Sequence, residues 1–256
     1  MTSGRAPRAP IRVLGNAAAL TELLAERGEL TPAELAEATG IPRPSVYRLV
    51  DGLRAVGLAA VADDGRVRLG VRWLHLGEAA RAALSEWSGA QTILDELSEQ
   101  TEQTAFLTVR REDEAVCVEW TPARGIGLLI LRPGRAIPLY AGGAGRALLA
   151  ASADREAYLA RGPFRALTDK TLTTADELRD SIAHIQAAGY VLSADDVTVG
   201  IGAVAVAVID PAGHPVGALS LAGRTNEIVE RQAEFAALLS QRAPAAYDAR
   251  PRMPSM

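Results

Sequence analysis

The sequence predicts an α+β protein with a small N-terminal domain of three helices and a β-hairpin, a linker helix, and a larger C-terminal α/β domain. Three observations support this fold class. The chain has 256 residues, more than the roughly 100 to 200 of most single domains. Helical apolar spacing and one hairpin signal fill the first 72 residues, and helix and strand periods alternate after residue 89. The predicted segments are a disordered tail at 1–10, the small domain at 11–72, the linker helix at 73–88, the large domain at 89–243 and a second disordered tail at 244–256.

The composition is that of an ordinary globular protein. Hydrophobic residues make up 48% of the chain and charged residues 23%, which suffices for a core and a solvated surface. No apolar run approaches the roughly 18 residues of a membrane helix, and the start of the chain lacks the apolar stretch of a signal peptide. We therefore expect a cytoplasmic protein with no membrane partner. Because Cys117 is the only cysteine, an intramolecular disulfide and a cysteine metal cluster are excluded.

The charge is distributed unevenly along the chain. The net charge of −4 argues, taken alone, against an extensive nucleic-acid-binding surface. Residues 1–72 nevertheless hold ten arginines and eight acidic residues, a net charge of +2, whereas residues 73–256 carry −6. A mildly basic N-terminal domain on an acidic body is compatible with a DNA reader joined to a second domain.

The first two predicted helices are defined by apolar spacing and by their end signals. Residues 13–27 place leucine and alanine at helical spacing and precede Gly28, a typical C-terminal stop. Thr31, Pro32 and Glu34 then form a capping-box pattern, in which the threonine hydroxyl and the glutamate carboxylate each satisfy a free backbone N–H. This pattern predicts a second helix over 32–39.

A third helical run follows closely enough to form a helix-turn-helix. Gly40 ends the second helix, and the periodic run over 43–57 begins after a connection of about four residues. Its apolar side chains face inward, so its polar groups occupy the outer face and the N-terminal end. A recognition helix enters the major groove with its N-terminus first, where arginines meet guanine edges or phosphates. The candidate DNA-contacting residues of this helix are Arg43, Pro44, Ser45, Tyr47 and Arg48.

A β-hairpin after the third helix is the predicted wing. Asp64 and Gly65 separate two short β-prone runs, which is a strong hairpin signal. Arg66 and Arg68 alternate with apolar residues on the second run, so one face packs while the other approaches the sugar-phosphate backbone. Each feature alone has a simpler explanation, because surface arginines are usually solvated and helix-turn-helix shapes also form dimer contacts. Their combination within about 60 residues favours DNA binding.

These motifs resemble the IclR family of bacterial transcription regulators over nearly the whole chain. IPRPSVYRLVDGLRAVGLAAV is similar to that family's recognition helix and wing, and VRLGVRWLHLGEAA to its passage into the linker helix. The resemblance implies a sequence-specific transcription regulator, which we expect to be a repressor, whose operator binding is modulated by a small-molecule effector. It also implies that Arg43, Ser45, Tyr47 and Arg48 face double-stranded operator DNA.

The predicted linker helix indicates self-association. Residues 73–86 carry more apolar side chains than one packing face needs, and we interpret the excess as a dimer surface. One recognition helix buries too little surface for a tight specific site, so two copies on a pseudo-palindromic operator are expected. The predicted assembly is a homodimer or a dimer of dimers.

The large domain is predicted to contain a largely antiparallel sheet with helices around it. The predicted helices cover residues 91–102, 144–152, 154–161, 174–189 and 226–241. The predicted strands cover residues 104–111, 115–120, 126–132, 190–194, 202–210 and 214–223.

A glycine-rich run is the candidate ligand site of this domain. In PLYAGGAGRALLA the small residues let a ligand approach backbone N–H groups at a helix N-terminus, which attracts anions, although the same glycines would also permit tight helix–sheet packing. The sequence resembles the GAF-like effector-binding domain of the IclR family here and over GYVLSADDVTVGIGAVAVAVIDPAGHPVGALSLAG. That resemblance implies that the effector, an organic acid or related metabolite, contacts Gly143, Ala144, Asp196, Ala207 and Ser220. Alanines at 207 and 222, where relatives carry polar residues or proline, predict a less polar pocket.

The residue inventory argues against catalysis. Three histidines lack metal-ligand spacing, and no serine lies in a nucleophile-elbow motif. Asp195 and Asp196 are adjacent in a predicted strand and would point to opposite faces, so they cannot act as a general acid and base pair. The sequence therefore offers no catalytic residue, metal site or cofactor. The alternatives are a GAF-like ligand-binding or enzymatic protein whose helix-turn-helix serves only dimerisation, and an adaptor that no longer binds DNA.

Overall fold

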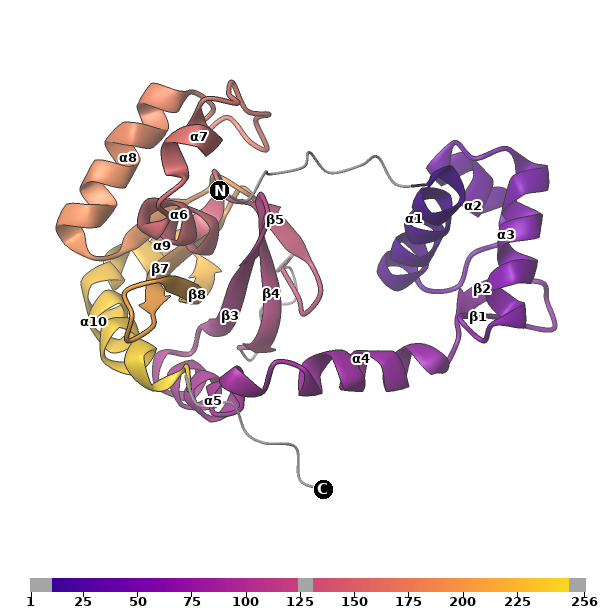
Figure 1. Cartoon of the computed structure of the whole chain (residues 1–256), viewed down its shortest axis with the longest axis horizontal. Coiled ribbons are helices and arrows are strands. Elements are labelled where there is room, and N and C mark those ends of the chain that lie inside the picture. Colours follow the sequence, from indigo (N-terminus) through magenta and orange to yellow (C-terminus); the bar gives the residue numbers. More distant parts are fainter. Residues whose placement is uncertain (1–10, 124–130, 249–256) are drawn as a thin grey trace. The chain divides into compact units, whose positions relative to one another are not determined.

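The computed structural model describes residues 11–123 and 131–248, and the chain divides into two compact units between Ala83 and Leu84 (Figure 1). The division falls inside the segment predicted as one linker helix over 73–88. Helix α4 covers Arg72–Ala82, and a separate 3-10 turn covers Ser85–Trp87. The linker helix is therefore present where it was predicted to begin, but it ends at Ala82 and not at residue 88. Trp87 is buried in the core of the second unit, and this burial draws residues 85–87 out of the helical path.

The first unit is a helix-turn-helix with a small wing, as predicted. Its elements are α1 (Arg12–Arg27), α2 (Pro32–Thr39), α3 (Arg43–Ala55), β1 (Ala59–Val61) and β2 (Val67–Leu69). The capping box of Thr31 and Glu34 is present at the start of α2, and Gly40 ends that helix with φ 68°. Leu20, Leu35 and Val46 are fully buried, one from each helix, and form the centre of the core.

Two side chains of α4 bond its start to the segment between α3 and β1. The Trp73 indole N–H donates to the Leu58 carbonyl at 2.8 Å, and the Arg72 guanidinium donates to the Val56 carbonyl at 2.7 Å. Gly70 precedes the helix at a close approach, since a Cβ at that position would lie 2.2 Å from the Gly57 carbonyl oxygen. The start of α4 is thus fixed on the segment between α3 and β1, while none of its residues is buried in the chain itself.

The second unit is built on one six-stranded antiparallel sheet, in the order β5-β4-β3-β8-β7-β6. Its strands are β3 (Thr104–Arg111), β4 (Glu114–Thr121), β5 (Ala136–Pro138), β6 (Val191–Ala194), β7 (Ile201–Ile209) and β8 (Pro215–Arg224). Its helices are α5 (Ala90–Thr101), α6 (Gly142–Ala151), α7 (Arg155–Leu159), α8 (Ala175–Ala188), α9 (Thr225–Glu230) and α10 (Gln232–Arg242).

Helices cover both faces of this sheet, and strand β7 shows how the faces differ. Val204, Val206 and Val208 belong to the core shared with α5, α9 and α10. Ala205, on the other face, belongs to the core shared with α6 and α8. Small residues on that second face let α6 come close, because a Cβ on Gly143 would lie 3.2 Å from the Ala205 Cβ. The short residues therefore set the spacing between α6 and the sheet.

Two predicted segments differ from the structure, a third lies largely outside the described residues, and one short strand was not predicted. The predicted helix over 226–241 is two helices, α9 and α10, which meet at Arg231. The strand predicted over 126–132 lies largely outside the described residues, and the short strand β5 was not predicted. Residues 244–248, predicted to belong to a disordered tail, are ordered: Ala246 is buried, and Tyr247 packs edge-on against Trp87 with ring centroids 5.0 Å apart. Composition suggested disorder there, but one aromatic pair anchors the segment.

We predict that Tyr247→Ala destabilises the second unit by about 1–3 kcal/mol, because the substitution removes the ring packing against Trp87. Thermal unfolding of the full chain, followed by circular dichroism, measures the change. Tyr247→Phe is the matched control and should unfold at nearly the wild-type temperature. Equal unfolding temperatures for Tyr247→Ala and the wild type would contradict this anchoring role.

Candidate nucleic-acid interface and effector cavity

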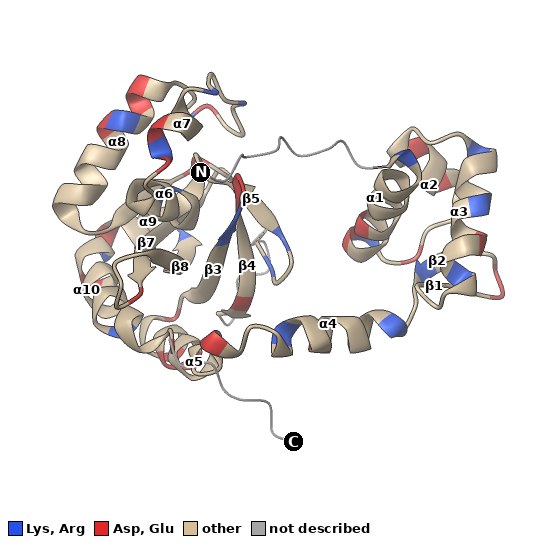
Figure 2. Ribbon diagram, in the orientation of Figure 1, with Lys and Arg blue, Asp and Glu red and all other residues tan. Residues whose placement is uncertain are grey.

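Helix α3 presents its predicted DNA-contacting residues on the surface. Arg43, Pro44, Tyr47 and Arg48 are exposed and Ser45 is half-buried, because Val46 and Val50 turn the opposite face of the helix into the core. Figure 2 shows basic residues along α3 and on the wing. Within the described residues, neither Arg43 nor Arg48 forms an ion pair. The two guanidinium groups are thus available to phosphates or to base edges.

The wing arginines, unlike Arg43 and Arg48, form ion pairs within the first unit. Arg68 pairs with Glu29 at 3.3 Å. Arg66 lies 3.6 Å from the carboxylates of both Glu34 and Asp64, and it donates to the Glu29 carbonyl at 3.2 Å. Both arginines were expected to approach the DNA backbone, and in the structure they already have carboxylate partners from the α1–α2 connection, the start of α2 and the turn of the hairpin.

A groove beside α3 contains two residues that sequence reasoning missed. Arg12 and Asn16 of α1 line it together with Ser45, Arg48 and Leu49 of α3. A basic and an amide side chain thus flank the N-terminal half of the recognition helix. Their distance of about 30 residues in sequence from α3 concealed this arrangement, and only the packing of the start of α1 against α3 reveals it.

The second unit holds a small cavity of about 70 Å³ between α6 and the sheet. It is lined by Phe106, Leu131, Ile137, Gly142, Gly143, Ala144, Ser193, Val197, Thr198, Ile201, Gly202, Ala203, Ser220 and Ala222. Most of these residues are apolar, and none carries a charge. The polar groups of the lining are hydroxyls and the backbone at the start of α6.

Three of the five residues implied for the effector site line this cavity, and two do not. Gly143, Ala144 and Ser220 lie on its wall. Ala207 lies beyond it, because its cross-strand partner on β8 is Ala218, whereas Ser220 pairs with Ala205. Ala203 and Ala222 occupy the apolar positions of the wall instead, and they face each other across β7 and β8.

The remaining residue, Asp196, is buried behind the cavity rather than within its lining. Its carboxylate accepts a hydrogen bond from the Gly142 N–H at 3.1 Å and pairs with Arg146 at 3.1 Å. It also accepts a short hydrogen bond from the Ser193 hydroxyl. Burial lowers the pKa of Arg146, and the nearby Asp196 carboxylate opposes this shift. Asp196 therefore joins α6 to the end of β6.

Asp195 has different hydrogen-bond partners from Asp196. It has a positive φ of 60° and follows β6, so the two aspartates lie in a turn and not in a strand as predicted. Its carboxylate accepts hydrogen bonds from the Gly200 N–H at 2.6 Å and the Thr225 hydroxyl at 2.7 Å. The two carboxylates thus have separate partners, which is incompatible with joint action as acid and base.

The N-terminus of α6 and Ser220 supply the hydrogen-bond donors of the cavity. No side chain caps α6, so beyond Gly142 the first N–H groups of this helix have no capping acceptor. The Ser220 side chain is 3% exposed, and its hydroxyl has no hydrogen-bond partner among the described residues. Gly145 has a packing role, since a Cβ there would lie 2.7 Å from the Pro138 carbonyl oxygen. The glycine run therefore has both of the roles considered from the sequence. Its first residues leave backbone N–H groups that a ligand can approach, and Gly145 permits tight packing against the Pro138 carbonyl.

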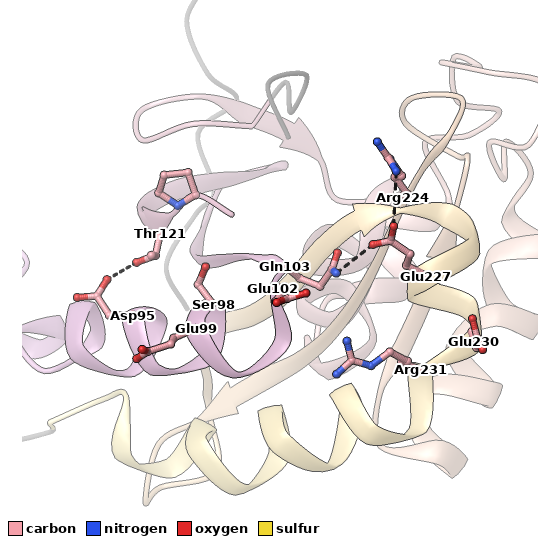
Figure 3. A pocket seen from close by; sticks show the side chains of 11 residues that line it. Asp95, Ser98, Glu99, Glu102, Gln103, Thr121, Arg224, Glu227, Glu230 and Arg231 are labelled. Carbon is pink, nitrogen blue, oxygen red and sulfur yellow. Dashed lines mark hydrogen bonds and ion pairs between the residues drawn. The ribbon is translucent and has the colours of Figure 1, made fainter. Parts of the chain in front are cut away.

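A second, larger cleft of about 820 Å³ lies between the ends of α5 and β4 and helix α9 (Figure 3). Some of its polar groups bond to one another: Asp95 accepts from Thr121 at 2.6 Å, and Gln103 donates to Glu227 at 3.2 Å. Arg231 donates to the Thr101 carbonyl at 3.1 Å. These contacts hold the end of α5 against α9, and the cleft lacks the apolar walls of the cavity beside α6.

The described residues gather no group of three potential metal ligands. His184 and His214 are exposed on different elements, where each contacts its own segment. Among residues 11–123 and 131–248, no helix is long and apolar enough to cross a bilayer.

Two family descriptions match nearly all of the described chain. Residues 13–62 match the IclR helix-turn-helix domain, and residues 86–246 match the bacterial transcriptional regulator IclR C-terminal domain. The gap between the matches contains the wing's second strand and α4.

Several known proteins are similar along most of their length. The HTH-type transcriptional regulator Rv1719 of Mycobacterium tuberculosis is 30% identical over 232 residues, which cover 90% of this chain and 88% of the relative. The transcriptional repressor IclR of Escherichia coli is 25% identical over 227 residues, covering 86% and 83%. An IclR homolog from Microbacterium hydrocarbonoxydans, solved in complex with 4-hydroxybenzoate, has the same fold with a TM-score of 0.76, at 23% identity over 92% of this chain and 97% of its own.

The relatives are transcription regulators and not enzymes, and this chain contains both the helix-turn-helix domain and the C-terminal domain that are described for the IclR family. The chain belongs to the IclR family and is a DNA-binding transcription regulator with a C-terminal effector-binding domain.

Proposed function

We propose that this regulator is a homodimeric repressor that reads a pseudo-palindromic operator with α3 and responds to a small monocarboxylate with an apolar body. The observation that carries the ligand class is the Ser220 hydroxyl, which has no hydrogen-bond partner among the described residues and shares with the start of α6 a cavity whose described lining carries no charge. The repressing direction is supported by relatives such as the transcriptional repressor IclR of Escherichia coli.

Operator recognition rests on α3 in this proposal. Arg43 and Arg48 are exposed without ion-pair partners among the described residues, so binding DNA costs them no existing ion pair. Pro44, Ser45 and Tyr47 complete the proposed reading surface. Arg66 and Arg68 contribute from the wing, where phosphates must compete with Glu29 and Glu34.

The dimer is supported by apolar side chains on α4 that this chain leaves uncovered. Leu74 is 77% exposed, and Val71 just before the helix is more exposed still. Leucine and valine at that exposure on a helix with no buried residue are typical of a surface that a second copy covers. A two-fold dimer presents two recognition helices to two half-sites.

The ligand class follows from what the cavity can satisfy. A carboxylate can accept hydrogen bonds from the backbone N–H groups of Gly143 and Ala144 and from Ser220, in the manner of anions at helix N-termini. Phe106, Ile201 and the alanines of the wall favour an apolar remainder. The Microbacterium homolog binds 4-hydroxybenzoate, a carboxylate on an apolar ring. At about 70 Å³ the present cavity accommodates a short-chain acid, whereas an aryl acid requires it to widen.

We predict that Arg48→Ala weakens binding to DNA from the gene's own promoter region by about 1–3 kcal/mol, because the substitution removes an unpaired guanidinium that can bond to a base or a phosphate. Fluorescence anisotropy at several salt concentrations measures the affinity. Arg54→Ala, at the far end of the same helix, is the matched control and should bind nearly as the wild type does. Wild-type affinity for Arg48→Ala would show that the assigned reading face is wrong.

We predict that Leu74→Glu converts the dimer to a monomer, because the substitution places a charge in an apolar interface. Sedimentation velocity reports the mass of the species in solution. Val199→Glu is the control, since Val199 is also highly exposed, at 73%, but lies in the second unit. An unchanged mass for Leu74→Glu would exclude α4 as the principal dimer surface.

We predict that Ser220→Ala weakens monocarboxylate binding by about tenfold or more, because the substitution removes a hydrogen bond to a charged group. Calorimetry measures the affinity for straight-chain acids from acetate to hexanoate and for the aryl acids benzoate and 4-hydroxybenzoate. The affinity of the variant for DNA in the absence of ligand should stay unchanged. Ala207→Ser adds a hydroxyl outside the cavity and should leave binding unaltered. The ligand class fails if the wild type binds none of these acids.

A further inference from the structure

The effector cavity and the buried Arg146–Asp196 ion pair share a wall. Gly142 and Ser193 both line the cavity, and both donate hydrogen bonds to the Asp196 carboxylate. Asp196 is 3% exposed, so water does not screen its charge from the cavity. A negative charge therefore lies directly behind the surface at which the proposed carboxylate binds.

That negative charge opposes an anionic ligand. The start of α6 attracts anions through its free N–H groups, but Asp196 already accepts the N–H of Gly142. No described residue that lines the cavity carries a positive charge. The positive charge that offsets Asp196 comes from the next turn of the same helix, where the guanidinium of Arg146 lies 3.1 Å from the carboxylate.

Arg146 is held in this position from several sides. It is 8% exposed, and its guanidinium donates to the Ser181 hydroxyl of α8 and to the Leu192 carbonyl of β6, both at 3.0 Å. These contacts keep the cation on Asp196 and outside the cavity lining. Its influence on a ligand is therefore exerted through Asp196 and not by direct contact.

We propose that Arg146 determines the charge of the ligand: by neutralising Asp196 it allows the cavity to accept a carboxylate in place of a neutral molecule of the same shape. Arg146 is in this sense a specificity-determining residue that does not touch the effector. The proposal rests on the monocarboxylate function proposed above, and it adds a requirement that this function does not itself contain.

A charge cycle with matched ligands tests the proposal. The variants are Arg146→Met, Asp196→Asn and the double variant, each as the full chain, with Arg146→Lys as the conservative substitution. The probes are butyrate with butyramide, or benzoate with benzamide, according to which acid the wild type binds more tightly. Each amide has nearly the shape of its acid but no charge. Calorimetry gives the two affinities, and circular dichroism confirms that each variant is folded.

The expected results separate charge from structure. Arg146→Met should weaken acid binding by about tenfold or more and leave amide binding within about twofold, because only the anion meets the uncompensated carboxylate. The double variant should restore acid binding to within about threefold of the wild type, since it removes both charges, and Arg146→Lys should retain it.

Removal of one partner of a buried ion pair can unfold a protein, so Asp196→Asn, whose amide oxygen can still accept the Gly142 N–H, is a second and independent variant. This variant leaves the cation unopposed, so acid binding should equal or exceed that of the wild type while amide binding stays unchanged. The proposal is overturned if Arg146→Met weakens acid and amide equally, or if Asp196→Asn weakens the acid more than the amide. Failure of the wild type to bind any acid instead removes the underlying ligand class.

Discussion

The close approach of α6 to one face of the sheet is the constraint on which the second unit depends. Alanines on β7 and β8 and glycines on α6 leave no room for longer side chains between them, as the 3.2 Å approach of a Gly143 Cβ to Ala205 indicates. This spacing places the N-terminus of a helix directly over a sheet. A cavity with backbone donors on one side and apolar strand residues on the other is the geometric result.

The same approach creates an electrostatic requirement. A helix N-terminus that faces a buried cavity exposes N–H groups with no acceptor, and the Asp196 carboxylate satisfies one of them. Burial of that carboxylate in turn requires a cation, which Arg146 provides from the same helix. The turn after β6, the start of α6 and the middle of α8 are thereby joined in one polar network beside the cavity.

Much of the fold could be predicted from the sequence, because its signals are local. The capping box at Thr31 and the Asp64-Gly65 hairpin determine their own backbone geometry within four residues. The lining of the cavity beside α6 was predicted less well. Asp196 and Ala207 were assigned to the ligand surface by resemblance, but which residues of a strand face a cavity depends on cross-strand register and on what lies behind them. The ordered end of the chain at Tyr247 likewise depends on Trp87, 160 residues away in sequence.

The wing arginines illustrate a further effect of packing on function. Arg66 and Arg68 each keep a carboxylate of their own unit as a counterion. DNA that binds the wing must displace Glu29, Glu34 or Asp64 before a phosphate takes its place, so the ion pair that is broken offsets part of the free energy of the new one. This cost is the same for every DNA sequence, so the internal counterions lower the electrostatic attraction of the wing to any DNA and leave a larger share of the binding free energy to sequence-dependent contacts. A protein that must search a whole chromosome for one site benefits from a wing that binds DNA weakly until the recognition helix is aligned with its operator.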